Sequence, residues 1–157
     1  MVNTLTLDRA WAALATVTDP EIPVLTIDDL GIVRGVAVQG DRATVTITPT
    51  YSGCPAMDVI RTDITEALTA AGFEHVDVQT VYAPAWTTDW MSDDGRRKLE
   101  EFGIAPPHRV SDQPRPPVLC PRCRTTARTV SEFGSTACKA LMVCTGCGEP
   151  FDYFKEI

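Results

Sequence analysis

The cysteines are the residues whose spacing most clearly indicates chemistry. Five of the six fall within 28 residues near the C-terminal end. Four of these form two Cys-x-x-Cys turns, separated by twenty residues: Cys120, Cys123, Cys144 and Cys147. Each such turn places two sulfur atoms on one side of the backbone, and four thiolates at tetrahedral corners suit Zn2+. We therefore predict a closed, structural zinc site, with iron in a rubredoxin-like site and a disulfide-linked knot as the alternatives.

Cys54 is the single cysteine of the N-terminal part. It stands between Gly53 and Pro55, after a predicted strand and before a predicted helix. Backbone N–H groups at a helix start stabilise a thiolate, and Asp58 follows one turn later. This placement permits a functional thiol, but most single cysteines are structural, so the residues alone favour a buried, inert packing residue. Cys138 fits neither Cys-x-x-Cys turn, so we predict a small buried residue there, with an alternate metal ligand as the other interpretation.

Two further segments carry side chains that could form a site. Four acidic residues occur with two prolines in one short stretch: Asp19, Glu21, Asp28 and Asp29. They form either a rigid acidic rim or a solvated connection in which Asp28 or Asp29 caps a turn. Residues 82–91 contain two of the three tryptophans. This aromatic loop either presents a docking surface or folds back over the core.

The N-terminal part is predicted to alternate helices and strands, which position these side chains. Apolar residues follow helical spacing in some segments and alternate with polar residues in others. The predicted elements are helix 7–17, strand 31–38, strand 42–48, helix 55–71, strand 75–82 and helix 92–102. Their order is α-β-β-α-β-α, which indicates the α+β class with a small mixed sheet and flanking helices. Three short strands around the second Cys-x-x-Cys turn complete a C-terminal zinc ribbon.

Composition divides the chain and narrows its partners. Residues 106–117 contain five prolines, so we expect a semi-rigid linker between an assembly-type domain at 1–105 and a ribbon domain at 118–157. A ribbon of that size needs a metal or other cross-link to fold. The net charge of −7 argues against a nucleic-acid partner. No membrane-spanning apolar run or secretory signal is visible, so we expect a cytoplasmic protein without a membrane partner.

Several motifs carry a resemblance to known families. The loop and the thiol turn read DPEIPVLTIDDLGIV and SGCP, at residues 19–33 and 52–55. Together they resemble the SufT-like iron–sulfur assembly domain. Further segments read TPTYSGCPAMDVI, YAPAWTTDWMS, CPRC, SEFGSTACKALMVC and EPFDYFK. With the ribbon included, the chain resembles the D subunits of bacterial phenylacetyl-CoA epoxidase systems over nearly its whole length.

The resemblance implies an accessory role in aerobic phenylacetate degradation. In these systems a di-iron oxygenase subunit epoxidises the ring and an iron–sulfur reductase component supplies electrons. The chain would be a non-catalytic subunit that assists iron–sulfur or di-iron centre assembly in these partner subunits. By the same kinship Cys54 becomes the functional thiol, holding iron or an iron–sulfur cluster transiently. The implied neighbours of that thiol are Asp19, Glu21, Asp29 and Asp58.

Two alternative functions and the oligomeric state stay open. An architectural subunit would stabilise the oxygenase complex without delivering metal. A cysteine-nucleophile enzyme would require a base close to Cys54. The exposed edge of a small sheet would also permit a homodimer. No dinucleotide fingerprint, phosphate loop or Glu-x-x-His pair occurs in the sequence, which argues against an autonomous oxygenase.

Overall fold

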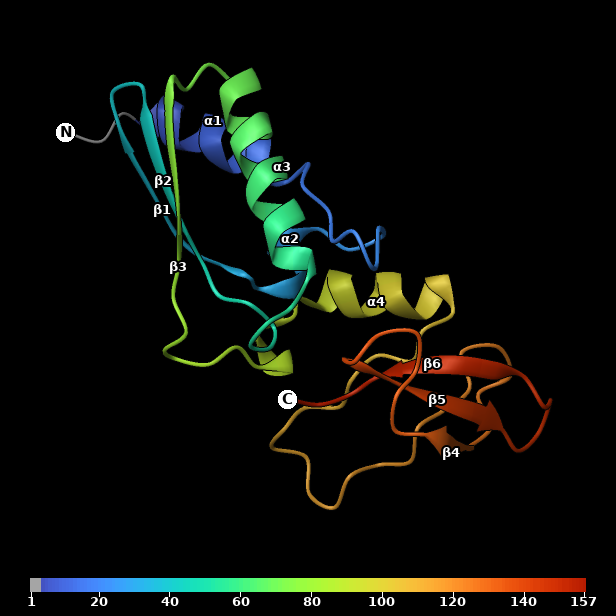
Figure 1. The fold of residues 1–157 in the computed structure, drawn as a ribbon. Coiled ribbons are helices and arrows are strands. Elements are labelled where there is room, and N and C mark those ends of the chain that lie inside the picture. Colours follow the sequence, from blue (N-terminus) through green and yellow to red (C-terminus); the bar gives the residue numbers. More distant parts are fainter. Residues whose placement is uncertain (1–3) are drawn as a thin grey trace. The chain divides into compact units, whose positions relative to one another are not determined.

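The computed structural model describes residues 4–157, which divide into two compact units between Trp86 and Thr87. The N-terminal unit contains three helices and three strands (Figure 1). They are α1 (Thr4–Leu14), α2 (Ile27–Leu30), β1 (Val33–Gln39), β2 (Arg42–Ile47), α3 (Ala56–Ala70) and β3 (His75–Thr80). The strand order is β1-β2-β3. Strands β1 and β2 are antiparallel, whereas β2 and β3 are parallel and are joined through α3, so the sheet is mixed as predicted.

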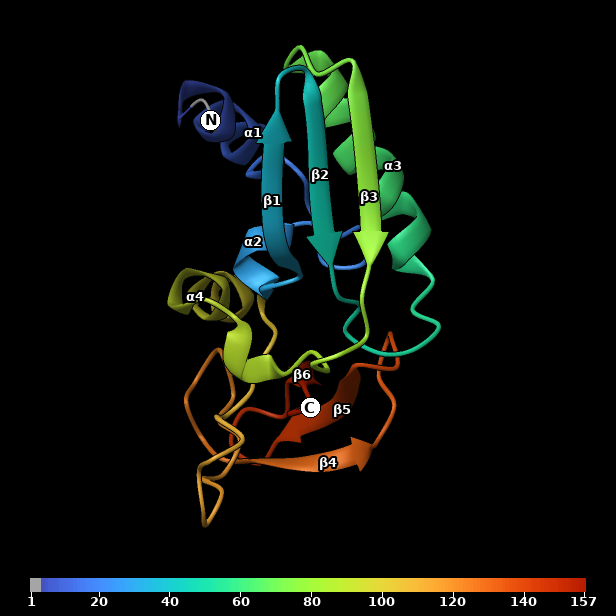
Figure 2. The same ribbon diagram turned by 90° about the vertical axis from the view of Figure 1, so that its left-hand side faces the viewer.

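Helices α1 and α3 pack on one face of this sheet (Figure 2). The apolar stripe of α3 consists of Ile60, Ile64 and Leu68, which are all almost completely buried. Strand β2 alternates between buried apolar and half-buried polar side chains, so its apolar face covers the same core. The core therefore lies between the helices and the sheet. The loops at the ends of the strands lie outside this core, where functional side chains can be accessible.

The C-terminal unit contains a second sheet. Its elements are η1 (Thr88–Trp90), α4 (Asp93–Phe102), β4 (Ala127–Ser131), β5 (Lys139–Cys144) and β6 (Pro150–Phe154). The three strands are antiparallel in the order β4-β5-β6. The α4 helix begins after Ser92, whose hydroxyl accepts a hydrogen bond from the Gly95 N–H, and ends at Gly103 in the left-handed conformation.

The segment after α4 is tied to the C-terminal sheet. The Ala105 N–H donates to the carbonyl of Asp152, and the Phe154 N–H donates to the carbonyl of Ala105. Residues 106–117 contain no helix or strand and belong, with α4, to the C-terminal unit. The domain limits at 1–105, 106–117 and 118–157 remain predictions. None of the helices within residues 4–157 has the length and apolar character needed to cross a bilayer.

The mixed α+β class is confirmed, and a few local details differ from the predictions. Helix α3 begins at Ala56, with Pro55 as its N-cap residue. The first helix ends at Leu14, although Val17 beyond it is still buried. The short elements α2 and η1 were not predicted, because four or three residues are too few to show a period.

Candidate metal centre and thiol pocket

Four cysteine sulfurs come together in the C-terminal unit. The Sγ atoms of Cys120, Cys123, Cys144 and Cys147 all lie within 4.8 Å of one another. Cys120 Sγ is 3.8 Å from Cys147 Sγ, and Cys123 Sγ is 3.3 Å from Cys144 Sγ. Tetrahedral zinc with four thiolates sets sulfur–sulfur distances of about 3.8 Å. All six cysteines of the chain are free, so the disulfide-linked alternative finds no support and the donor set fits zinc.

The two cysteine turns have matching backbone geometry. The Arg122 N–H donates to Cys120 Sγ at 3.4 Å, and the Gly146 N–H donates to Cys144 Sγ at 3.3 Å. A second N–H, from Cys147, reaches Cys144 Sγ at 3.4 Å. Hydrogen bonds from backbone N–H groups stabilise negative charge on sulfur. Each turn therefore prepares its first cysteine to be a thiolate ligand.

The residue four places after the first cysteine closes each turn. Arg124 and Gly148 both have positive φ, 65° and 77°. Their N–H groups donate to the carbonyls of Cys120 and Cys144 at 2.9 and 3.2 Å. Glycine reaches this conformation freely, whereas arginine does so at a cost. The Arg124 guanidinium forms an ion pair with Glu100, which holds the side chain in place.

Cys123 is an exposed member of the cluster with a distinct electrostatic environment. Hydrogen bonds with Thr125 lower the pKa of the Cys123 thiol to about 6. The side chain of Thr125 has the larger effect and its backbone the smaller one. Metals bind the thiolate form of cysteine. This shift favours the thiolate form of Cys123 as a metal ligand.

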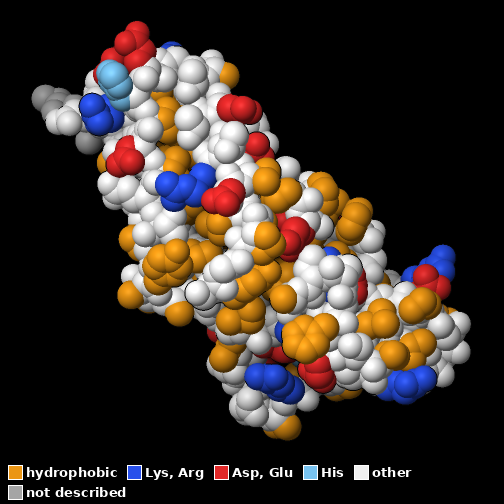
Figure 3. Space-filling model, viewed as in Figure 1, with side chains coloured by type: hydrophobic (Ala, Val, Ile, Leu, Met, Phe, Trp, Pro, Cys, Tyr) orange, Lys and Arg blue, Asp and Glu red, His pale blue; other side chains and the backbone are white. Residues whose placement is uncertain are grey.

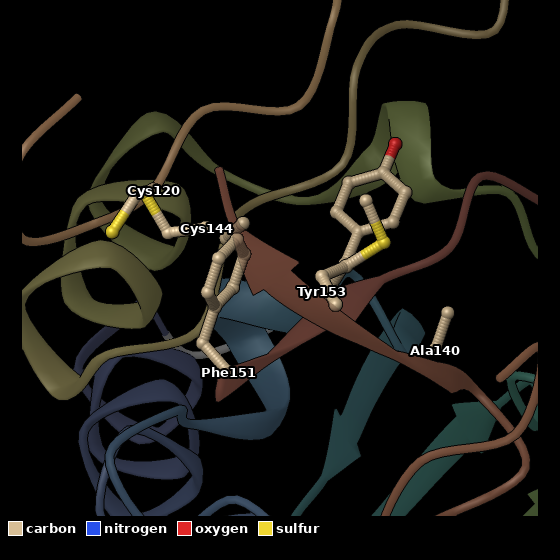
Figure 4. Packing of buried hydrophobic residues seen from close by; sticks show 7 residues of the cluster. Cys120, Ala140, Cys144, Phe151 and Tyr153 are labelled. Atoms are coloured by element: carbon tan, nitrogen blue, oxygen red, sulfur yellow. The ribbon is translucent and has the colours of Figure 1, made fainter. Parts of the chain in front are cut away.

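The apolar packing of the ribbon is continuous with this cluster. Figure 4 shows Cys120 and Cys144 close to the ring of Phe151, with Tyr153 and Ala140 farther along the same layer. Cys120 and Cys144 are themselves almost fully buried members of that core. These two metal-ligand candidates are therefore part of the core of the ribbon, whereas Cys123 and Cys147 lie at its surface.

Replacement of Gly146 is expected to strain the second cysteine turn. A Cβ atom at this position would lie 2.8 Å from Thr125 Oγ1 and 3.0 Å from Thr125 Cβ. We expect Gly146→Ala to lower the free energy of unfolding of the ribbon by about 1–3 kcal/mol, as overpacking does. Thermal unfolding of the zinc-loaded protein measures this. The control is Gly35→Ala, where a Cβ would meet no atom within 4 Å; equal unfolding temperatures for the two variants would contradict the expectation.

Cys54 lies in a separate pocket in the N-terminal unit, with a cavity volume of about 390 Å³. The pocket is formed where β2 and β3 end and α3 begins. Its polar lining residues are Cys54, Asp58, Arg61, Thr80 and Tyr82. The thiol is half-buried, so it is neither freely exposed nor enclosed in the core. Cys54 is therefore not fully buried, and its role as a functional thiol remains a prediction.

A tight turn presents the thiol at the start of α3. The Cys54 N–H donates to the carbonyl of Tyr51 at 3.3 Å, and the Met57 N–H donates to the carbonyl of Cys54 at 3.2 Å. Gly53 has a φ of 79°, a conformation that side chains disfavour. Pro55 is the N-cap and provides no side-chain hydrogen bond to the helix. The arrangement offers a thiol that can bind a soft metal ion beside an open cavity.

A guanidinium on the next turn of α3 shares this pocket. Arg61 Nη1 donates to Thr80 Oγ1 at 2.6 Å, and Nη2 donates to the carbonyl of Val78 at 3.0 Å. The side chain therefore bridges α3 and β3 and is held in one orientation. Arg61 was not among the residues predicted from the sequence, because its two partners are 17 and 19 residues away and no local pattern connects them.

The acidic loop is largely occupied with its own structure. Asp19 is buried, and its Oδ1 accepts hydrogen bonds from the N–H groups of Glu21 and Ile22 at 2.7 and 3.1 Å. Asp29 and Thr26 form a capping box at the start of α2. Both carboxylates thus stabilise local turns.

Of the four carboxylates predicted to surround Cys54, Asp58 lines the thiol pocket, and Asp19, Glu21 and Asp29 are not among its lining residues. Within residues 4–157, Cys54 belongs to no group of three or more closely spaced metal-ligating side chains. The roles of these four carboxylates toward the thiol remain predictions.

The structure also shows the surroundings of the remaining cysteine, Cys138, and of the aromatic loop at residues 82–91. Cys138 is buried, lies outside the four-sulfur cluster, and its Sγ is 3.0 Å from Thr136 Oγ1. Trp86 folds back into the N-terminal unit, where it is 3% exposed, and its Nε1 donates to the carbonyl of Leu30. Tyr82, at the start of the same loop, is exposed. The loop therefore contains one buried aromatic residue, Trp86, and one exposed aromatic residue, Tyr82.

A small mixed sheet with a thiol turn, followed by a three-stranded sheet with four clustered cysteines, defines a class of protein: an assembly-type α+β domain joined to a zinc ribbon. Residues 7–80 match the family described as iron-sulfur cluster assembly protein, and residues 105–155 match the PaaD zinc beta ribbon domain. The chain belongs to the family formed by the D subunits of 1,2-phenylacetyl-CoA epoxidases. The resemblance noted from the sequence motifs is thereby confirmed.

The first of three comparisons carries this assignment, and the other two concern the N-terminal part of the chain. The chain is 54% identical, over 94% of its length and 91% of the relative's, to the Escherichia coli (strain K12) protein that is named as the putative D subunit of 1,2-phenylacetyl-CoA epoxidase. A Porphyromonas gingivalis protein named Fe-S protein maturation auxiliary factor is 39% identical, over 55% of this chain and 83% of its own. The crystal structure of a DUF59 domain of unknown function from Bacillus anthracis matches with a TM-score of 0.56 and 28% identity, over 60% of this chain and 92% of its own.

Proposed function

We propose that this chain is an accessory, non-catalytic subunit of a phenylacetyl-CoA epoxidase system, and that it helps to assemble an iron–sulfur or di-iron centre in a partner subunit. In this proposal Cys54 holds the iron cargo transiently. The partner is the di-iron oxygenase or the iron–sulfur reductase component. The family membership and the name of the Porphyromonas gingivalis relative support this role.

The observation that carries the proposal is the setting of Cys54. A half-buried thiol at the edge of an open cavity is accessible to a partner and partly shielded from solvent. A single protein thiolate binds an iron unit weakly enough for the unit to be released to a partner subunit. Asp58, Thr80 and Tyr82 supply oxygen atoms around the same cavity. The pocket lining contains no histidine, the usual base beside a cysteine nucleophile, so the cysteine-nucleophile alternative would have to rely on Asp58.

We further propose that Cys120, Cys123, Cys144 and Cys147 hold one zinc ion. Zinc bound by four thiolates has no open coordination position, so it supplies a structural cross-link and takes no part in iron transfer. The residues themselves do the remaining work: backbone N–H groups orient Cys120 and Cys144, and the ribbon sheet keeps the two turns facing each other.

The test of the proposed function is Cys54→Ser, which keeps the size of the side chain and removes the soft sulfur ligand. We expect the iron content and epoxidase activity of co-expressed partner subunits to fall about tenfold or more, since loss of one ligand or its support typically costs that much. Zinc content should be unchanged. Ser52→Ala, an exposed change on the same turn, is the control. Full partner maturation by Cys54→Ser would overturn the proposal.

An architectural role is the second candidate, and one observation favours it. Apolar side chains reach the surface on the face of the C-terminal unit seen in Figure 3. Within that unit Val130 and Phe133 are 53% and 70% exposed. Exposed apolar residues mark an interaction surface where they form a contiguous patch. Under this alternative Phe133→Ser would weaken co-purification with the oxygenase subunits, while Cys54→Ser would leave partner iron unchanged.

A further inference from the structure

The positive charge of Arg61 has no carboxylate partner within the part of the chain that the structure describes. Its two hydrogen bonds go to neutral oxygens, those of Thr80 and Val78. A guanidinium has five N–H donors, so three remain after these bonds. The residue lines the same cavity as Cys54, one helical turn after Asp58. Arg61 also lines a second cavity with Glu66 and Asp77, but it forms no ion pair with either of these described residues. Its charge is therefore available to a ligand of opposite charge.

We propose that Arg61 binds negative charge in the Cys54 pocket, and that the iron cargo is therefore an anionic, thiolate-ligated iron–sulfur unit and not a hydrated ferrous ion. This inference rests on the proposed function and selects between its two kinds of cargo. Iron–sulfur units with thiolate ligands carry net negative charge, which the guanidinium attracts. A hydrated Fe2+ ion at the same sulfur would be repelled by it.

Asp58 does not cancel this preference. Asp58 is exposed to solvent, so water and dissolved salt screen the charge of its carboxylate. Arg61 is half-buried and is held by two hydrogen bonds, so its charge acts from a constant position. Asp58, at the rim, is placed to accept a hydrogen bond from an outer thiol ligand or from a partner.

The loading step is a ligand exchange without electron transfer. The Cys54 thiol releases its proton, and its sulfur forms a bond to one iron of the incoming unit. The bond from that iron to one external thiolate breaks, and the leaving thiolate takes up the proton to become a thiol. Arg61 keeps its proton throughout and faces the remaining negative charge of the unit.

Two probes of opposite charge test the inference on zinc-loaded protein under anaerobic conditions. One is a [4Fe–4S] cluster ligated by 2-mercaptoethanolate, a dianion, and the other is ferrous sulfate. Bound iron, bound acid-labile sulfide and visible absorption are measured for the wild type, Arg61→Gln, Arg61→Lys and Cys54→Ser. Arg42→Gln is the matched control, because Arg42 is an exposed arginine at the opposite end of the strand β2 that pairs with β3.

We expect Arg61→Gln to bind the cluster about tenfold more weakly, the size of one partly screened charge interaction. Arg42→Gln should stay near the wild type, and Arg61→Lys, which keeps the charge but not the two hydrogen bonds, should bind the cluster more tightly than Arg61→Gln. Ferrous ion should bind Arg61→Gln at least as well as the wild type. Added salt should weaken cluster binding by the wild-type chain. This measurement tests the charge interaction without any variant, so it does not depend on whether a variant folds.

Other outcomes separate the two levels of the argument. Wild-type cluster binding by Arg61→Gln, with none by Cys54→Ser, would overturn the role of Arg61 and leave the function of the thiol standing. Equal loss of cluster and ferrous ion in Arg61→Gln would mean that Arg61 only supports the fold, as would cluster binding that does not respond to salt. Undiminished binding of the cluster by Cys54→Ser would overturn the proposed function itself.

Discussion

Removal of zinc is expected to unfold the β4–β5–β6 sheet while the N-terminal unit stays folded. The core of the ribbon is small, and Cys120 and Cys144 belong to it. Bound structural zinc contributes about 10–16 kcal/mol of apparent folding free energy in small metal-dependent domains. A sheet of this size has too little apolar surface to replace that contribution. We therefore expect a cooperative loss of ribbon structure when a chelator strips the metal.

Amide signals in a two-dimensional NMR spectrum measure this unit by unit. Signals from β5 and β6 should collapse to random-coil positions with chelator and return with added zinc, and those from β1 to β3 should stay dispersed. Cys144→Ser should show the collapsed ribbon at any zinc concentration. Cys138→Ala is the control, because this buried cysteine lies outside the cluster. A ribbon that keeps its dispersed signals after complete zinc removal would refute the expectation.

The regular elements could be predicted because their periodicity coincides with their burial. Ile60, Ile64 and Leu68 recur every four residues, and all three are buried on α3. Ala43, Val45 and Ile47 alternate with threonines in the sequence and are buried on β2. In both cases the side-chain spacing alone decides which face can leave water, so tertiary context adds little to the prediction.

The thiol pocket could be predicted only in part. Cys54 was singled out because a strand-to-helix turn with Gly53 is visible in the sequence. Arg61 was not, because its role depends on β3 lying beside β2 after the α3 crossover, which brings Thr80 to the same end of the sheet. A contact between residues 19 positions apart has no local signal.

The acidic loop shows the opposite difficulty. Asp19 and Asp29 have the chemistry of metal ligands, so the sequence left open both an acidic rim and a connection in which Asp28 or Asp29 caps a turn. The structure shows each carboxylate accepting hydrogen bonds from nearby backbone N–H groups. The sequence contains a capping-box pattern, since Thr26 stands three residues before Asp29. A capping box usually has Glu or Gln at its fourth position and precedes a longer helix, so this pattern is easily missed. Short acidic stretches therefore need backbone geometry before they can be assigned a role.

Trp86→Ala is expected to give the largest loss of stability among single changes in the aromatic loop. The indole is 3% exposed, and its Nε1 donates to the carbonyl of Leu30 at 2.8 Å. Leu30 is the last residue of α2, where helix carbonyls lack partners within the helix. Truncation would leave a cavity and an unsatisfied buried carbonyl, at a cost of about 3–5 kcal/mol in the free energy of unfolding.

Trp86→Phe separates the two contributions, since it keeps most of the ring volume and loses only the hydrogen bond, for an expected cost of about 1–3 kcal/mol. Tyr82→Ala is the matched control: this ring is 66% exposed, so its removal should change stability by about 0.5 kcal/mol or less. Urea unfolding followed by circular dichroism ranks the three variants. If Trp86→Ala and Tyr82→Ala unfolded at the same urea concentration, Trp86 would not be the anchor of this loop, and its indole would have to serve a partner instead of the core.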